Sequence, residues 1–166
     1  MSRLTLLALT LGPVVWSACA RPPEPAPLPA KPALPPKAPA PIWSDFEASR
    51  EWPISTEHWF VSRGHYGGTS EALVRVSPAA IERYRQHTPG AKLEPGTVLV
   101  MLHRSRTTGK RGPVHVMQRE SSDWTYLLLE PDGRIVRRGA LPLCARCHAE
   151  AVSDSVFGPP HEAGPE

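Results

Sequence analysis

The amino-acid sequence predicts a predominantly β fold of the α+β class, with an antiparallel sheet and a few short helices. The prediction rests first on three closely spaced runs of β-branched, aromatic and aliphatic residues in the second half of the 166-residue chain. Turn sequences rich in Gly, Pro and Asp separate these runs. Helical signals are confined to short segments, and strands do not alternate with helices as they do in β-α-β folds.

The predicted strands follow one another closely, which is typical of an antiparallel meander. They are Thr97–His103, Val114–Arg119 and Trp124–Glu130, and the turn Pro131-Asp132-Gly133 leads from the third run into Ile135-Val136. Short turns of this kind join neighbouring antiparallel strands, whereas parallel strands need a long crossover.

Side chains alternate between the two faces of a strand. Leu99, Met101 and His103 therefore share one face of the first predicted strand, and His115 and Met117 share one face of the second. We expect these two sets of side chains to face the same bound group.

A short helix is expected before the first of these strands. Ser77-Pro78 is typical of a helix start, with a capping side chain and a proline at the first helical position. The segment Ala79–His87 has one apolar side, formed by Ile81 and Tyr84, and Pro89-Gly90 ends it.

The pentapeptide Cys144-Ala145-Arg146-Cys147-His148 has the spacing that covalent attachment of a c-type haem requires. Two thiols one helical turn apart can bond the two vinyl groups of the porphyrin, and the adjacent imidazole can ligate its iron. The motif predicts one covalent haem c in the core, bound through Cys144 and Cys147, with His148 as the metal ligand. We expect a second short helix to carry it.

The number of cysteines disfavours other uses of this C-x-x-C pair. The chain contains three cysteines, and the third, Cys19, lies near the N-terminus, so no second pair completes a four-ligand zinc site. A redox dithiol of the thioredoxin type is expected at a helix start after a buried parallel strand. The sequence shows no such arrangement, and haem attachment is the better interpretation.

Residues 1–18 are typical of an export signal peptide. After Arg3, the run from Leu4 to Val15 is apolar except for two threonines, and Gly12-Pro13 breaks it. The run is too short to span a bilayer as a mature helix. Export fits the haem motif, because c-type haem is attached outside the cytoplasm.

Two cleavage sites are compatible with this signal. Ser17-Ala18-Cys19 resembles a bacterial lipobox, in which Cys19 is lipidated and becomes the mature N-terminus, although Trp16 replaces the usual aliphatic residue. Ala18-Cys19-Ala20 also fits ordinary cleavage. We favour the lipoprotein because it gives Cys19 a use, and we expect a periplasmic protein that is anchored to a membrane or otherwise soluble.

Residues 19–41 form a proline-rich segment after the signal. From Ala20 to Pro41 nearly every second residue is proline, which excludes helix and sheet and favours polyproline II. Fully extended, it would reach roughly 70 Å at about 3.1 Å per residue, which makes it a tether for a membrane-anchored domain. Without lipidation it is a disordered leader. Residues 42–166 have the size of one domain and form the predicted mono-haem cytochrome domain.

The charge pattern does not indicate a nucleic-acid partner. The formal net charge is +3, and one cationic cluster surrounds a Thr-Thr-Gly turn: Arg104, Arg106, Lys110 and Arg111. No aromatic or groove-reading residues are interleaved with these charges. A solvated hairpin loop explains the cluster, with a docking patch for an anionic partner as the alternative.

The order of several segments resembles that of the cytochrome P-460 and cytochrome c′-beta family. The segments are VRVSPAAIERY, PGTVLV, DWTYLLLEPDG, CARCH and SDSVF, between about Trp59 and Phe157. The resemblance implies a mainly antiparallel β-sheet with a few helices, and it makes His148 the proximal iron ligand.

Two departures from the family pattern bear on function. In hydroxylamine-oxidising members a lysine bonded to the porphyrin directly follows the strand that resembles PGTVLV, and here that position is Met101. A thioether cannot form the lysine's bond, and Lys92 and Lys110 lie in flanking loops. On a gap-free match, His115 takes the place of the family's distal glutamate, and an imidazole can relay protons or ligate iron.

Each distal candidate also has a plain interpretation. Met101 can be a soft core filler against the haem, and His115 can be an exposed strand histidine. The remaining histidines show no pattern that selects them, so structural or solvent roles are the default for His58, His65, His87, His103 and His161.

Three functions follow. The resemblance implies a protein that binds a small diatomic or nitrogen-oxide ligand such as nitric oxide, or an enzyme that oxidises hydroxylamine. The third is an electron carrier whose sixth iron position is filled by Met101, Met117 or His115. We favour an open sixth position, because side chains on a sheet face are rigidly packed, and we assign no catalytic residue. The sequence leaves open a redox partner protein and a homodimer.

Overall fold

The computed structural model describes residues 39–56 and 58–158. The predicted signal peptide, Cys19 and its alternative cleavage sites, most of the proline-rich segment and His161 lie outside the described residues. No helix within the described ranges is long and apolar enough to cross a membrane.

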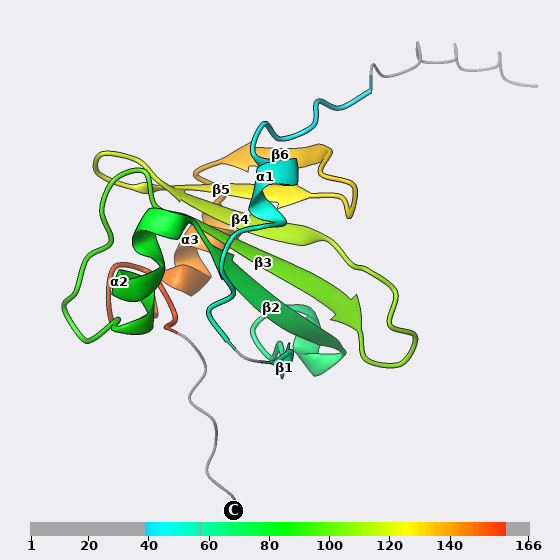
Figure 1. Ribbon diagram of the computed structural model, residues 1–166, viewed down its shortest axis with the longest axis horizontal. Helices are drawn as coiled ribbons and strands as arrows, with labels where there is room; N and C mark the ends of the chain where they lie inside the picture. The colour runs from blue at the N-terminus through cyan, green and yellow to red at the C-terminus, as the bar shows by residue number, and fades with distance from the viewer. Residues whose placement is uncertain (1–38, 57, 159–166) are drawn as a thin grey trace, which may run out of the picture. The chain divides into compact units, whose positions relative to one another are not determined.

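A six-stranded sheet forms the centre of the fold (Figure 1). Its strands are β1 (Phe60–Val61), β2 (Ser70–Val76), β3 (Val98–Ser105), β4 (Val114–Arg119), β5 (Trp124–Leu129) and β6 (Ile135–Gly139). They lie in chain order, each antiparallel to the next. The predicted antiparallel meander and the predominantly β fold class are confirmed.

The sequence did not reveal the first two strands. β2 pairs with β3 along its whole length, but its sequence SEALVRV lacks a clean alternation, and Leu73, Val74 and Val76 are all buried. A strand buried on both faces loses the period of two that marks a half-exposed strand. β1 has only two residues and carries no pattern of its own.

One face of the sheet is covered by the short helix α1 (Phe46–Ser49) and the residues before it. Trp43 and Phe46 pack there against alternate residues of three strands: Val98, Val100, Val114, Val116, Leu127 and Leu129. Gly133, in the turn between β5 and β6, has a φ of +87°, and a Cβ there would overlap the ring of Phe46. Only glycine satisfies both demands.

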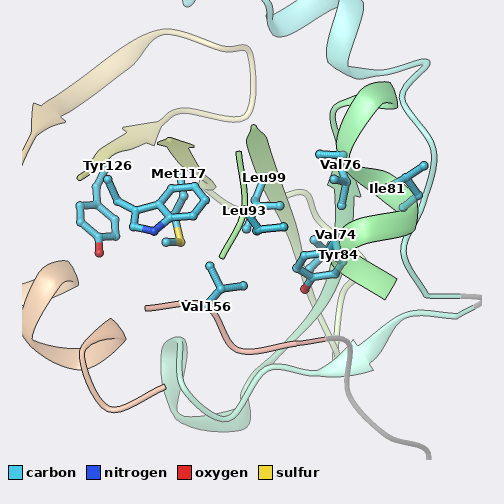
Figure 2. Packing of buried hydrophobic residues seen from close by; sticks show 11 residues of the cluster. Val74, Val76, Ile81, Tyr84, Leu93, Leu99, Met117, Tyr126 and Val156 are labelled. Carbon is cyan, nitrogen blue, oxygen red and sulfur yellow. The ribbon is translucent and has the colours of Figure 1, made fainter. Parts of the chain in front are cut away.

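The opposite face is covered by α2 (Ile81–Arg85), α3 (Pro142–His148) and the segment after α3. Its buried cluster comprises Val74, Val76, Ala80, Ile81, Tyr84, Leu93, Leu99, Met117, Trp124, Tyr126 and Val156. Figure 2 shows Val156 pointing from the C-terminal segment toward Leu93 and Leu99, and Tyr126 at the end of the cluster near α3. Met101 and Cys144 border this cluster.

The helix predicted for Ala79–His87 is shorter than expected. A 3₁₀ turn η2 (Pro78–Ala80) leads into α2, and Pro78 holds the first position as predicted. The Ser77 side chain does not cap the helix. Its Oγ accepts the N–H of Val98 at 3.1 Å instead, so this serine ties the helix to the start of β3.

Candidate haem site

The C-x-x-C-H motif lies on the helix α3, as predicted. Pro142 occupies the first turn, where its missing N–H leaves no bond unmade. Cys144 and Cys147 are both free thiols, the first half-buried and the second exposed. Residues three apart on a helix lie on the same side, so the two sulfur atoms are available to one flat group beside α3.

His148, the last residue of α3, is held by a single hydrogen bond. Its Nδ1–H donates to the carbonyl oxygen of Ser155 at 2.9 Å, and its ring contacts Tyr126 and Phe157, each with ring centres 5.5 Å apart. A donor at Nδ1 fixes the tautomer and leaves the lone pair on Nε2. Burial lowers the pKa of His148, and the Ser155 carbonyl partly opposes this shift. The imidazole is therefore neutral at neutral pH, with its lone pair on Nε2.

The turn that supplies this carbonyl is anchored to the rest of the domain. Asp154 and Ser155 both have positive φ values, 50° and 57°. The Asp154 carboxylate accepts the N–H of Leu93 at 2.9 Å and lies 3.3 Å from Arg119 Nη2, with both side chains largely buried. The Asp154 carbonyl accepts the indole N–H of Trp124 at 2.7 Å. These bonds give His148 a fixed acceptor.

Strands β3 and β4 form a wall of the candidate site, next to β5, whose Tyr126 contacts His148 of α3. Met101 lies opposite His115 and Leu99 opposite Met117 in the register of these strands, and the predicted sharing of one face is confirmed. Met101 borders the cluster next to α3, while Leu99 and Met117 are buried within it. The exposed-strand interpretation of His115 does not hold, since this histidine is only partly exposed and contacts Tyr66.

A loop after β1 brings two further side chains to this wall. Tyr66 Oη lies 2.9 Å from His115 Nε2, and His65 Nδ1 lies 3.2 Å from Met101 Sδ. The rings of His65 and His115 have centres 4.3 Å apart. On the other side, the ring centre of His65 lies 6.3 Å from that of His148.

His103 completes the group of imidazoles. Its Nδ1–H donates to the carbonyl of Pro113 at 3.1 Å, and its Nε2 lies 3.4 Å from Ser62 Oγ. Its ring centre is 5.0 Å from that of His115 and 5.3 Å from that of His65. With both nitrogens bonded to the protein, this side chain has a structural role.

The imidazoles at this wall are neutral at neutral pH. Burial, followed by repulsion from neighbouring imidazoles, lowers the pKa of His115 to about 3 and that of His103 to about 4. The pKa of His65 is lowered by burial and then by His148. Neutral imidazoles keep a nitrogen lone pair, which a protonated ring would lose.

The predicted candidates Met101, His115, Cys144 and His148 thus border one region between α3 and the sheet, whereas Cys147 is exposed on the same helix. Sequence reasoning missed His65 and Tyr66, which reach it from a loop whose length and path leave no periodic signal. The tripeptide Tyr66-Gly67-Gly68 marks a turn beside a histidine, and this is the one local signal that could have drawn notice.

Comparisons with family models, curated proteins and solved structures find no match for this chain. The resemblance to the cytochrome P-460 and c′-beta family therefore rests on the sequence segments alone.

The residues present fit a covalently attached haem. The donor set is two free thiols and one imidazole with an available Nε2, which is the set that a c-type haem uses. Phe157 and Tyr66 are 52% and 42% exposed although both contact imidazoles of the site, so a large apolar group has surface to cover here. Among the described residues no group of three or more His, Cys, Asp and Glu could hold a bare metal ion.

Proposed function

We propose that this protein is an exported mono-haem c-type cytochrome that binds small ligands such as nitric oxide at the haem iron, as the c′-beta branch of the family does. One observation carries the proposal. The C-x-x-C-H helix presents two free thiols and a histidine whose Nδ1–H is bonded to the Ser155 carbonyl, so that Nε2 is free for iron.

In this proposal each residue of the motif has a separate task. Cys144 and Cys147 hold the porphyrin through two thioether bonds, and His148 ligates the iron from the proximal side. The Ser155 carbonyl orients the imidazole, and Tyr126 and Phe157 flank its ring. The haem, when bound, supplies an iron centre that takes up diatomic ligands and changes oxidation state.

Met101 favours a ligand binder over a hydroxylamine-oxidising enzyme. It occupies the position where such enzymes are expected to carry the cross-linking lysine, and its Sδ contacts His65 instead. A thioether cannot donate the bond that an amine forms with the porphyrin. The chromophore is therefore expected to keep ordinary c-type conjugation.

The proposal includes export and a membrane anchor. The signal-like residues 1–18 and the lipobox-like Ser17-Ala18-Cys19 support delivery to the periplasm, with the proline-rich residues 19–41 as the tether. Partners are then a small diatomic or nitrogen-oxide ligand and, for changes in oxidation state, a redox protein.

The test compares gas binding with substrate turnover in the purified holoprotein. The ferrous protein is expected to show an ordinary c-type Soret band that shifts with nitric oxide or carbon monoxide, and no hydroxylamine oxidation. Met101→Lys is the informative variant, since it restores the family residue and could then cross-link under peroxide. A red-shifted, cross-linked chromophore in the wild-type protein, or its sustained turnover of hydroxylamine, contradicts the binder and favours the enzyme.

A further inference from the structure

His65 is the histidine that faces His148 from the sheet side of the site. It lies in the loop between β1 and β2, and its ring stands among those of Tyr66, His103 and His115. The burial pattern of the loop is uneven: His65 is partly buried, whereas Gly64 and Tyr66 on either side are exposed. The chain thus directs the His65 imidazole inward between two exposed neighbours.

The separation between these two rings suits a shared metal ion. Their centres are 6.3 Å apart with an interplanar angle of 37°. Metal–imidazole nitrogen distances are about 2.0–2.1 Å. Adding the distance from each nitrogen to its ring centre places two axial imidazoles of one iron roughly 6 Å apart from centre to centre.

The hydrogen bonds leave His65 with a free ligand atom. Its Nδ1 lies 3.2 Å from Met101 Sδ, and a thioether sulfur is an acceptor only, so Nδ1 carries the proton and Nε2 the lone pair. His148 is in the same tautomeric state because Nδ1 donates to Ser155. Both residues therefore have Nε2 available, as two ligands of one iron require.

The other side chains around His65 that could ligate a metal ion are already engaged. His115 Nε2 is bonded to Tyr66 Oη, and Met101 Sδ is bonded to His65. Both nitrogens of His103 have partners, Pro113 and Ser62. His65 can ligate through Nε2 without breaking any of these contacts, including its own bond from Nδ1 to Met101 Sδ.

The loop can also withdraw this imidazole. Gly67 and Gly68 have φ values of 56° and 80°, and Tyr66 has a φ of 55°, in a region that a non-glycine residue rarely adopts. Gly64, Tyr66 and Gly67 are exposed, and short-range backbone hydrogen bonds such as Gly68 N–H to Ser62 hold the loop, so its displacement disturbs less buried packing than that of a central strand. A packed strand residue such as Met101 lacks this freedom.

We propose that His65 is the sixth ligand of the haem iron in the resting protein, and that a small ligand must displace it to bind. This inference rests on the proposed function, and it revises the open sixth position that we favoured from the sequence. The open position was expected because side chains on the sheet face are rigidly packed, whereas His65 lies in a loop.

The test measures carbon monoxide binding to the full-length reduced protein at increasing gas concentrations, together with the ferric absorption spectrum. The wild-type protein is expected to be low-spin, with a binding rate that levels off at the rate of His65 dissociation. His65→Ala is expected to be high-spin, with a rate proportional to gas concentration and an apparent affinity higher on the order of tenfold or more. His58→Ala, a change at an exposed histidine outside this group of rings, serves as the matched control and should keep the low-spin spectrum and the plateau.

The outcomes separate this inference from the proposed function. Haem that is lost to acid acetone defeats the proposed function itself, whatever His65 does. Haem that is retained in a high-spin wild-type protein, or a low-spin spectrum abolished by His115→Ala or Met101→Leu instead, overturns the role of His65. Added imidazole should return His65→Gly to the low-spin state. If neither His65 variant folds, electron paramagnetic resonance of the ferric wild-type protein decides between two imidazole ligands and an imidazole with a thioether.

Discussion

At the scale of single residues, one hydrogen bond determines which nitrogen of the motif histidine is available to a metal ion. A C-x-x-C-H sequence leaves the tautomer of its histidine undefined, whereas the bond from His148 Nδ1 to Ser155 assigns the proton and frees Nε2. The sequence predicted the three motif residues because their spacing is local. It could not assign roles to His65 or Tyr66, because their neighbours Met101 and His115 are distant in the chain.

The buried imidazole of His103 predicts a loss of stability in mild acid. Burial lowers its pKa from 6.5 to about 4, so between these values the unfolded chain binds a proton that the folded chain does not. Stability from this residue is therefore complete above about pH 6.5 and falls as the pH decreases toward 4. At about pH 5 the loss should be on the order of 1–2 kcal/mol relative to neutral pH.

Urea unfolding at neutral pH and at about pH 5 checks this prediction in wild-type protein and in His103→Asn. The amide can still donate to the Pro113 carbonyl but does not titrate. The variant should lose less stability than the wild-type protein on acidification. An equal loss in both would show that His103 does not cause the acid sensitivity.

At the scale of elements, the sequence predicted the helices and strands that a local pattern marks, such as the alternation of a half-exposed strand. The strand Val114–Arg119 and the motif helix occur as predicted, because alternation and proline position mark them. β2 was missed because it is buried on both faces. The turn at residues 153–156 was recognisable only as part of the family resemblance, and its anchors come from two distant segments, residues 87–93 and Trp124.

The anchoring of this turn predicts a large effect of Asp154→Ala. The change leaves the buried guanidinium of Arg119 without its carboxylate and the Leu93 N–H without its acceptor. Breaking a buried ion pair from one side costs about 3–5 kcal/mol. The free energy of unfolding should fall by about this amount, and His148 should lose its fixed orientation.

Asp132→Ala is the matched control for this change. Asp132 also bonds an arginine, Arg134, but both side chains are more than half exposed, and exposed pairs contribute little. Urea unfolding of both variants makes the comparison. Similar stabilities for the two variants would contradict the anchoring of the turn.

At the scale of the whole molecule, the two faces of the sheet have different tasks. The face under α1 is closed by Trp43 and Phe46, and the other face borders α3 and the imidazoles. Alternation along β3 and β4 predicted which side chains share the second face. It could not show which segments cover this second face, because the loop after β1 and the segment after α3 cover it.

The membrane anchor is a prediction at this scale. If Cys19 is lipidated, the wild-type protein should sediment with membranes, and Cys19→Ser should release it into the periplasmic fraction. Immunoblotting of the two fractions makes the measurement. A soluble wild-type protein with Arg21 at its mature N-terminus would remove the anchor and leave export alone.

The central claim is that one haem is attached covalently through Cys144 and Cys147. Acid-acetone extraction of the purified exported protein tests it most directly, because a haem held by thioether bonds stays on the polypeptide. We expect a coloured pellet from the wild-type protein, weaker retention of haem in Cys147→Ala, and a changed iron spin state in His148→Ala. A colourless pellet from the wild-type protein would contradict the account.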